Sequence, residues 1–180
     1  MSLTVAHPYT PTSVTRLDTT ALAEIVHGLA RAEDLWRPHV LHNPDERARV
    51  RLLATPAYEV WLLGWTPGQY VGLHDHGGAN AAFFVVDGAL TETAAANPHD
   101  RLVRDLVERT IDAGEPGAVE AGHVHDIANR SASLATSIHA YSKPLQSMGF
   151  YDRSEPGVRG HRVRTLWVEE ETAVLQDIPA

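Results

Sequence analysis

Two histidines one residue apart, His74 and His76, precede a Gly-Gly pair and an apolar run. On an extended strand, side chains two residues apart point to the same side. Two imidazoles on one face can chelate a transition metal. The pair therefore predicts a metal site, and the alternative interpretation is a chance pair of surface histidines.

A second histidine pair lies in the segment GHVHDIAN, which contains His123 and His125. Either residue could supply a third imidazole, because they are also two positions apart. The chain has no cysteine, which excludes disulfides and thiolate metal sites and means that any thiol must come from a substrate. A closed structural site has four ligands, so three imidazoles would leave open positions for chemistry.

A third set of polar side chains alternates along one short run. Ser137, His139 and Tyr141 are separated by Ile138 and Ala140, so the three polar groups would share one face of a strand. If that face points to the interior, the hydroxyl, imidazole and phenol must hydrogen-bond to one another. The alternative is an ordinary polar strand that faces solvent.

The elements that must position these groups fall into two parts. Residues 18–33 have apolar positions at helical spacing after an Asp or Thr N-cap, which predicts a helix. Residues 43–54 begin with Asn-Pro, a further helix-start signal. From Tyr58 onward, short β-rich runs are punctuated by Gly, Pro, Asn and Asp, which is typical of an all-β sandwich or barrel.

We therefore expect a single domain over residues 1–180, with three segments. Residues 1–56 form an N-terminal helical cap and residues 57–152 form the core of a small antiparallel β-barrel. Residues 153–180 contain two β-like runs, VRTLWVEE and TAVLQDI, which predict further strands or a tail along the barrel.

The composition and charge of the chain limit the classes of partner that it could bind. The formal charge is −8, from 15 basic and 23 acidic side chains, which argues against nucleic-acid and anionic-membrane binding. No apolar run approaches the ~20 residues of a membrane span. The N-terminus lacks the pattern of a signal peptide, so we expect a cytoplasmic protein, either a monomer or a homodimer.

The histidine segments resemble the two sequence motifs of the cupins. Gly68-x5-His74-x-His76 with a later Gly88 resembles the first motif, and Gly114-x5-Glu120-x-Gly122-x2-His125-x3-Asn129 resembles the second. The first motif usually adds a glutamate, but residues 79–82 are Ala-Asn-Ala-Ala. The resemblance implies a cupin barrel whose metal ligands are His74, His76 and His125, with Fe(II) the favoured ion and His123 the competing third ligand.

Residues 45–152 further resemble the cysteine dioxygenases. The shared features are Trp65 ahead of the first histidine pair and the run SIHAYSKPLQSMGFYD, which carries the Ser-His-Tyr relay of that family. The resemblance implies addition of O2 to a small thiol, with Tyr141, His139 and Ser137 as the catalytic relay. L-Cysteine is the expected substrate, and 3-mercaptopropionate or another thiol acid is the alternative.

The same resemblance implies a substrate pocket. Arg51 matches the family's carboxylate-binding arginine, and Arg49 is the neighbouring alternative. An arginine suits this role because its guanidinium group binds a carboxylate in bidentate fashion. Tyr58, Trp65 and Met148 are expected to line the pocket or its roof. Met148 stands where the mercaptopropionate enzymes usually carry an arginine, which favours the cysteine type.

The chain departs from the family pattern at two places. Animal members cross-link a cysteine to the relay tyrosine, and the aligned position here falls near Ala81, so Tyr141 is expected to be unmodified. Where the family usually has Ser-Pro-Pro, this chain has Ser142-Lys143-Pro144. A cis peptide bond before a non-proline residue costs about 2.5–4 kcal/mol, so we expect the Ser142–Lys143 bond to be trans. A cupin that binds metal or ligand without turnover is the alternative from another functional class.

Overall fold

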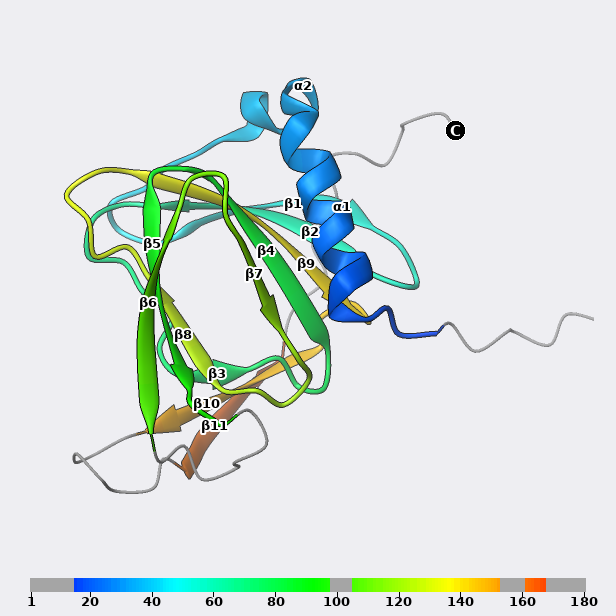
Figure 1. The fold of residues 1–180 in the computed structure, drawn as a ribbon, viewed down its shortest axis with the longest axis vertical. Helices are drawn as coiled ribbons and strands as arrows, with labels where there is room; N and C mark the ends of the chain where they lie inside the picture. The colour runs from blue at the N-terminus through cyan, green and yellow to red at the C-terminus, as the bar shows by residue number, and fades with distance from the viewer. Residues whose placement is uncertain (1–14, 98–104, 153–160, 168–180) are drawn as a thin grey trace, which may run out of the picture.

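The computed structural model describes residues 15–97, 105–152 and 161–167. The described chain begins with the helices α1 (Thr19–Arg31) and α2 (Glu33–Trp36) and the 3-10 turn η1 (Arg37–His39). Strands follow, as Figure 1 shows. Their bounds are β1 (Ala48–Ala54), β2 (Glu59–Trp65), β3 (His74–Asp75), β4 (Asn80–Asp87), β5 (Ala89–Ala95), β6 (Leu106–Asp112), β7 (Pro116–Val119), β8 (His125–Ala128), β9 (Ala135–Ser142), β10 (Ser147–Asp152) and β11 (His161–Trp167).

The strands form two antiparallel sheets. One has the order β1-β2-β9-β4-β7 and the other has the order β11-β10-β3-β8-β5-β6. Buried side chains of both sheets, among them Trp65, Phe83 and Ile127, form the interior core. The predicted all-β fold with a small N-terminal helical cap is confirmed.

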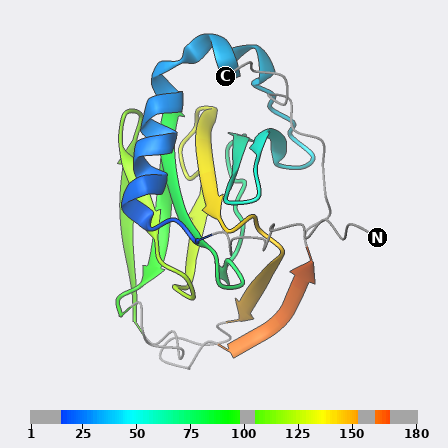
Figure 2. The same cartoon turned by 90° about the vertical axis from the view of Figure 1, so that its right-hand side faces the viewer.

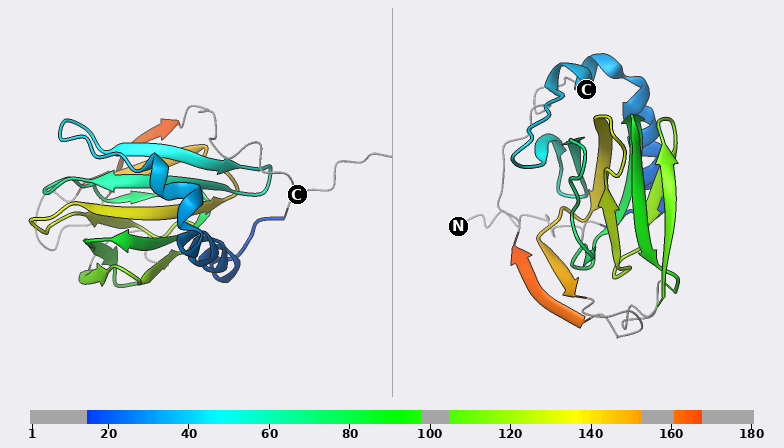
Figure 3. Two further views of the ribbon diagram at one scale, coloured as in Figure 1. Left: turned by 90° about the horizontal axis from the view of Figure 1, so that it is seen from above. Right: turned by 90° about the vertical axis from the view of Figure 1, so that its left-hand side faces the viewer.

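The helix predicted over residues 18–33 is confirmed as α1. Its N-cap is Asp18, whose side chain accepts a hydrogen bond from the Ala21 amide at 2.8 Å. Leu22 and Val26, one turn apart, are fully buried and pack against Ile138 on the outer face of the first sheet. Figure 2 shows α1 lying along the outside of the strands. The right-hand panel of Figure 3 shows β10 and β11 at the end of the barrel away from the α1–α2 turn.

The helix suggested by Asn-Pro at residues 43–54 is wrong. This segment forms β1, an edge strand that pairs with β2. The period of two in the sequence, with Arg49 and Arg51 alternating with Val50 and Leu52, fits a strand better than the capping signal fits a helix. The first sheet therefore begins inside the segment that we assigned to the helical cap.

Three further expectations have mixed outcomes. The run VRTLWVEE supplies most of β11, whereas TAVLQDI lies outside the described residues. The Ser142–Lys143 peptide bond is cis, so the expectation of a trans bond is wrong. No helix among the described residues is long and apolar enough to span a membrane.

Candidate metal centre

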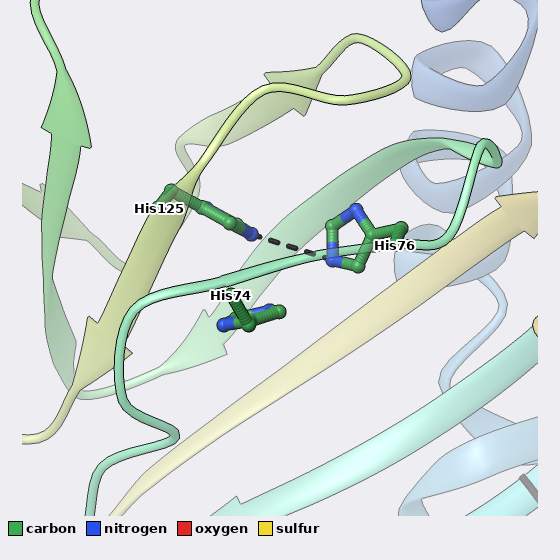
Figure 4. A group of neighbouring side chains, drawn as sticks. All are labelled: His74, His76 and His125. Carbon is green, nitrogen blue, oxygen red and sulfur yellow. Dashed lines mark hydrogen bonds between the residues drawn. The ribbon is translucent and has the colours of Figure 1, made fainter. Parts of the chain in front are cut away.

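His74 and His125 are brought together by strand pairing. They are Cα partners of the β3–β8 ladder, and their ring centroids lie 4.6 Å apart. Both side chains are buried. Figure 4 shows that the two rings project from neighbouring strands into the same space.

His76 reaches the same space from the turn after β3, because that strand ends at Asp75. Asp75 closes the turn by accepting a hydrogen bond from the Gly77 amide at 2.8 Å. Gly77 has φ +60, and a Cβ there would lie 2.4 Å from the Ser147 carbonyl oxygen, so this close approach requires glycine. The ring of His76 is 5.0 Å from that of His125, and their Nε2 atoms are 3.3 Å apart (Figure 4).

The three histidines form a set of donors that fits a metal ion. One ligand atom from each lies within 4.8 Å of the others. Burial, followed by the neighbouring imidazoles, lowers the pKa of His74 and of His76 well below its usual range, so both rings are neutral. Imidazole nitrogens that converge on one point in this way are suited to a transition metal.

Hydrogen bonds at the remote nitrogens fix two of these rings. Nδ1 of His74 donates to the Gly72 carbonyl at 2.8 Å, and Nδ1 of His125 donates to a carboxylate oxygen of Glu92 at 2.9 Å. Each bond leaves Nε2 as the free lone pair that faces the other histidines. Nδ1 of His76 is buried and has no hydrogen-bond partner among the described residues. His123, the competing third ligand, instead lies with Nε2 3.1 Å from the Ala95 carbonyl oxygen.

Glu92 on β5 was missed by the sequence analysis. Its side chain is buried, and its second oxygen accepts from Nε and Nη2 of Arg109 on β6, both at 2.7 Å. Burial by itself would raise the pKa of Glu92, but the hydrogen bonds and charges of His125 and Arg109 outweigh it and lower that pKa. The available signal was its position, two residues after buried Leu90 on the inward face of a strand.

The Ser-His-Tyr row lies on β9 and is buried. Ser137 Oγ is 2.8 Å from His139 Nε2, and the Tyr141 hydroxyl is 3.4 Å from His139 Nδ1. Trp65 on β2 extends the row by donating its indole N–H to Ser137 Oγ at 2.9 Å. The Tyr141 ring lies 5.1 Å from that of His76, so the row ends beside the three histidines.

Burial sets the protonation of the row. It lowers the pKa of His139 to about 3, with smaller contributions from the Arg47 and His125 charges, so this ring is neutral. Burial also raises the pKa of the Tyr141 phenol, which is therefore protonated. Ala81 is the cross-strand partner of Tyr141 on β4, so the position aligned with the family's cross-linking cysteine does lie next to this ring.

A cavity of about 270 Å³ opens over the three histidines and Tyr141. Of the expected pocket residues, Trp65 and Met148 line it. The cations in its wall are Arg47 and Arg49, and the guanidinium carbon of Arg47 lies 4.8 Å from the centroid of the Trp65 ring. The buried Nε of Arg47 has no hydrogen-bond partner among the described residues.

Arg51 and Tyr58 do not line this cavity. Arg51 forms an ion pair with buried Glu59 at 3.0 Å. Tyr58 packs in the cluster that joins α1 to the outer face of the first sheet. The described residues that line the cavity therefore do not include these two, and the expectation that they line the pocket is corrected.

Comparison with solved structures supports the fold class, a double-stranded β-helix. TT1209 of Thermus thermophilus is 19% identical, with a TM-score of 0.52 over 60% of this chain and 93% of that chain. An uncharacterised Klebsiella pneumoniae protein with a double-stranded β-helix domain is 16% identical, with a TM-score of 0.50 over 74% of this chain and 94% of that chain. A recombinant oxalate oxidase is 20% identical, with a TM-score of 0.51 over 60% of this chain and 56% of that chain.

Within this class, residues 13–154 match the family cysteine dioxygenase type I. The match covers most of the chain, and the chain belongs to that family. Family and three-histidine site together support a cupin thiol dioxygenase with a non-haem metal site, acting on a small molecule and O2.

Proposed function

We propose that the protein is an Fe(II)-dependent dioxygenase of a small thiol acid, with L-cysteine as the first substrate to test and 3-mercaptopropionate as the alternative. The observation that carries the proposal is the meeting of three buried imidazoles at the floor of a cavity that also holds a tyrosine hydroxyl and an arginine. A binding module without turnover would not need the aligned polar row on β9.

The reaction balances without another reductant. Both oxygen atoms of O2 are added to sulfur, which loses the electrons that O2 gains, and the thiol proton is released to solvent as the sulfinate forms. Fe(II) held by His74, His76 and His125 would mediate electron transfer from sulfur to O2 and offer open positions that bring thiol and O2 together. The remaining tasks belong to the side chains around that site.

Arg47 is the residue to which we assign the substrate carboxylate. It lies in the cavity wall, stacked on Trp65, with donors that a carboxylate can accept in bidentate fashion. Arg49 lies two residues along the same face of the chain and is the second candidate. None of the described residues that line the cavity is acidic, so a free ammonium group would find no carboxylate among them.

The hydrogen-bond row has a direction. Trp65 can only donate, so Ser137 Oγ accepts from it, and the Ser137 hydroxyl proton is then directed to Nε2 of His139. His139 in turn carries its proton on Nδ1 and donates toward the Tyr141 oxygen. This order leaves the Tyr141 proton free to point at the reacting sulfur or oxygen.

The cavity walls would keep bulk water from the reacting atoms. Besides the polar groups named above, the lining is apolar and includes Leu63, Val71, Phe83, Ile127, Leu145 and Met148. Exclusion of water strengthens the contacts of Arg47 and Tyr141 with substrate, because charges and dipoles interact more strongly in a medium of low dielectric constant.

The test is oxygen uptake by protein loaded with Fe(II) under anaerobic conditions. L-Cysteine and 3-mercaptopropionate carry a carboxylate, and cysteamine is the matched thiol without one. We expect one O2 consumed per sulfinate formed with at least one thiol acid, and far slower uptake with cysteamine. Metal-loaded protein that consumes no O2 with any of the three thiols would instead support the binding module.

A further inference from the structure

One of the three histidines, His125, hydrogen-bonds a charged side chain, that of Glu92. Its two carboxylate oxygens are divided between two partners: one accepts from Nδ1 of His125 at 2.9 Å, and the other accepts from Arg109 at 2.7 Å. Glu92 is 4% exposed, whereas the Arg109 side chain is 54% exposed. An anion is thus buried against the metal centre while its counter-ion is partly solvated.

This arrangement costs free energy that a surface ion pair would not. Withdrawing a carboxylate from water costs several kcal/mol unless its partners compensate. Two N–H donors of Arg109 and one of His125 provide that compensation and keep Glu92 ionised. Glu108 on the neighbouring strand β6 instead makes its ion pair, with Arg130 after β8, at the surface, where the acid is not buried.

The set of three ligands that the structure brings together contains no carboxylate. The residues after His76 where the cupin motif usually places a glutamate are Ala79, Asn80, Ala81 and Ala82. A carboxylate that accepts from the remote nitrogen of a ligating histidine orients the ring and increases its basicity as a ligand. Glu92 therefore brings to the site, through His125, the negative charge that the donor set lacks.

We propose that Glu92 and Arg109 are a pair of positioning residues that set the affinity and reduction potential of the metal held by His74, His76 and His125. Glu92 fixes His125 with its lone pair toward the metal and stabilises the higher charge of Fe(III) relative to Fe(II). Arg109 offsets part of that negative charge from the solvent side. The inference rests on the proposed function only in requiring that the three histidines bind iron.

The two members of the pair should act in opposite directions. Glu92→Gln keeps an acceptor for His125 but removes the charge, so the Fe(III)/Fe(II) potential should rise. Arg109→Gln leaves Glu92 less compensated, so the potential should fall. A residue that serves only to stabilise the fold would not shift the potential in a direction set by the sign of its charge.

The experiment measures Fe(II) affinity and reduction potential for the wild type and these two variants. Glu108→Gln and Arg130→Gln are matched controls, because they make the same changes in an exposed pair whose acid lies on β6 of the same sheet. We expect Glu92→Gln to weaken Fe(II) binding by roughly 10- to 100-fold, the usual effect of losing such a partner. Zn²⁺ affinity provides a readout without redox chemistry, and Glu92→Gln should weaken Zn²⁺ binding as it weakens Fe(II) binding.

Two results separate the possible failures. If wild-type protein binds no metal, the proposed function fails. If wild-type protein binds iron but Glu92→Gln and Arg109→Gln match their controls, or shift the potential in the same direction, the inference about this pair is overturned while the proposed function stands. Circular dichroism of each metal-free variant distinguishes loss of the fold from loss of metal affinity.

Discussion

The Arg47 guanidinium lies over the Trp65 ring, 4.8 Å from its centroid, and the indole N–H of Trp65 donates to Ser137. The cation in the cavity wall and the polar row on β9 are therefore two ends of one set of contacts. A substrate carboxylate on Arg47 would be held beside the row that ends at Tyr141.

Replacing Arg47 by Gln should remove the carboxylate partner. We expect kcat/KM for a thiol acid to fall by roughly 10- to 100-fold, mostly through KM, because a hydrogen bond to a charged group contributes about 1.5–3 kcal/mol. Steady-state oxygen uptake measures the effect. Arg37→Gln, in an exposed pair with Glu33, is the control and should match wild type. If Arg47→Gln leaves KM unchanged, the substrate carboxylate is bound by Arg49 or by another residue, and the assignment to Arg47 is wrong.

Replacing Arg51 by Gln should affect stability rather than substrate binding. The change leaves buried Glu59 without its cation and should lower the free energy of unfolding by about 3 kcal/mol, as measured by urea denaturation. Replacing both residues with apolar side chains should recover much of the loss. A stable Arg51→Gln variant with the raised KM expected for Arg47→Gln would restore the original sequence-based assignment.

The polar row should act through Tyr141. Tyr141→Phe should lower kcat by roughly 100-fold or more, since it removes the proton donor at the reacting atoms. Trp65→Phe should lower kcat less, with little change in KM, because it only reorients Ser137 and His139. If Trp65 acts through Tyr141, the variant that combines Trp65→Phe with Tyr141→Phe has the same kcat as Tyr141→Phe alone. If the two losses in kcat instead multiply, Trp65 does not act through the hydrogen-bond row.

Acid should destabilise the metal-free protein through His139. Its pKa is about 3 in the folded state against an ordinary value of 6.5, so below pH 6.5 the unfolded chain binds a proton that the folded chain does not. The contribution of His139 to the free energy of unfolding is fully present above pH 6.5. It is lost as pH falls toward 3, by up to about 1.4 kcal/mol per pH unit for this one group. Urea denaturation at pH 7.5 and pH 5 should give a smaller difference for His139→Gln than for wild type. Equal differences would assign the acid sensitivity to other groups.

The motif resemblance was sufficient to group the three histidines, and the period of two was sufficient for the β9 row. His74 and His125 come from separate motifs, yet strand pairing makes them direct neighbours, as the motif spacing implied. Alternation of Ser137, His139 and Tyr141 likewise put all three on one face. The apolar residues between them face α1, which explains why the whole strand is buried.

The sequence did not identify residues whose roles depend on long-range register. Arg47, Arg49 and Arg51 share the same alternation, and only the position of Glu59 across the β1–β2 pair separates Arg51 from the cavity. Glu92 lies in a run of threonines and alanines without a motif, and its contact with His125 depends on β5 pairing with β8. The helix signal at residues 43–54 failed because pairing with β2 outweighed a local capping preference.

The most direct test of the account is the metal content of protein loaded anaerobically with Fe(II) and freed of excess ion, measured for the wild type and four single histidine-to-alanine variants. The account predicts one ion per chain in wild type and in His123→Ala, and loss of that ion in His74→Ala, His76→Ala and His125→Ala. Iron retained in His125→Ala but lost in His123→Ala, or no iron in wild type, would contradict it.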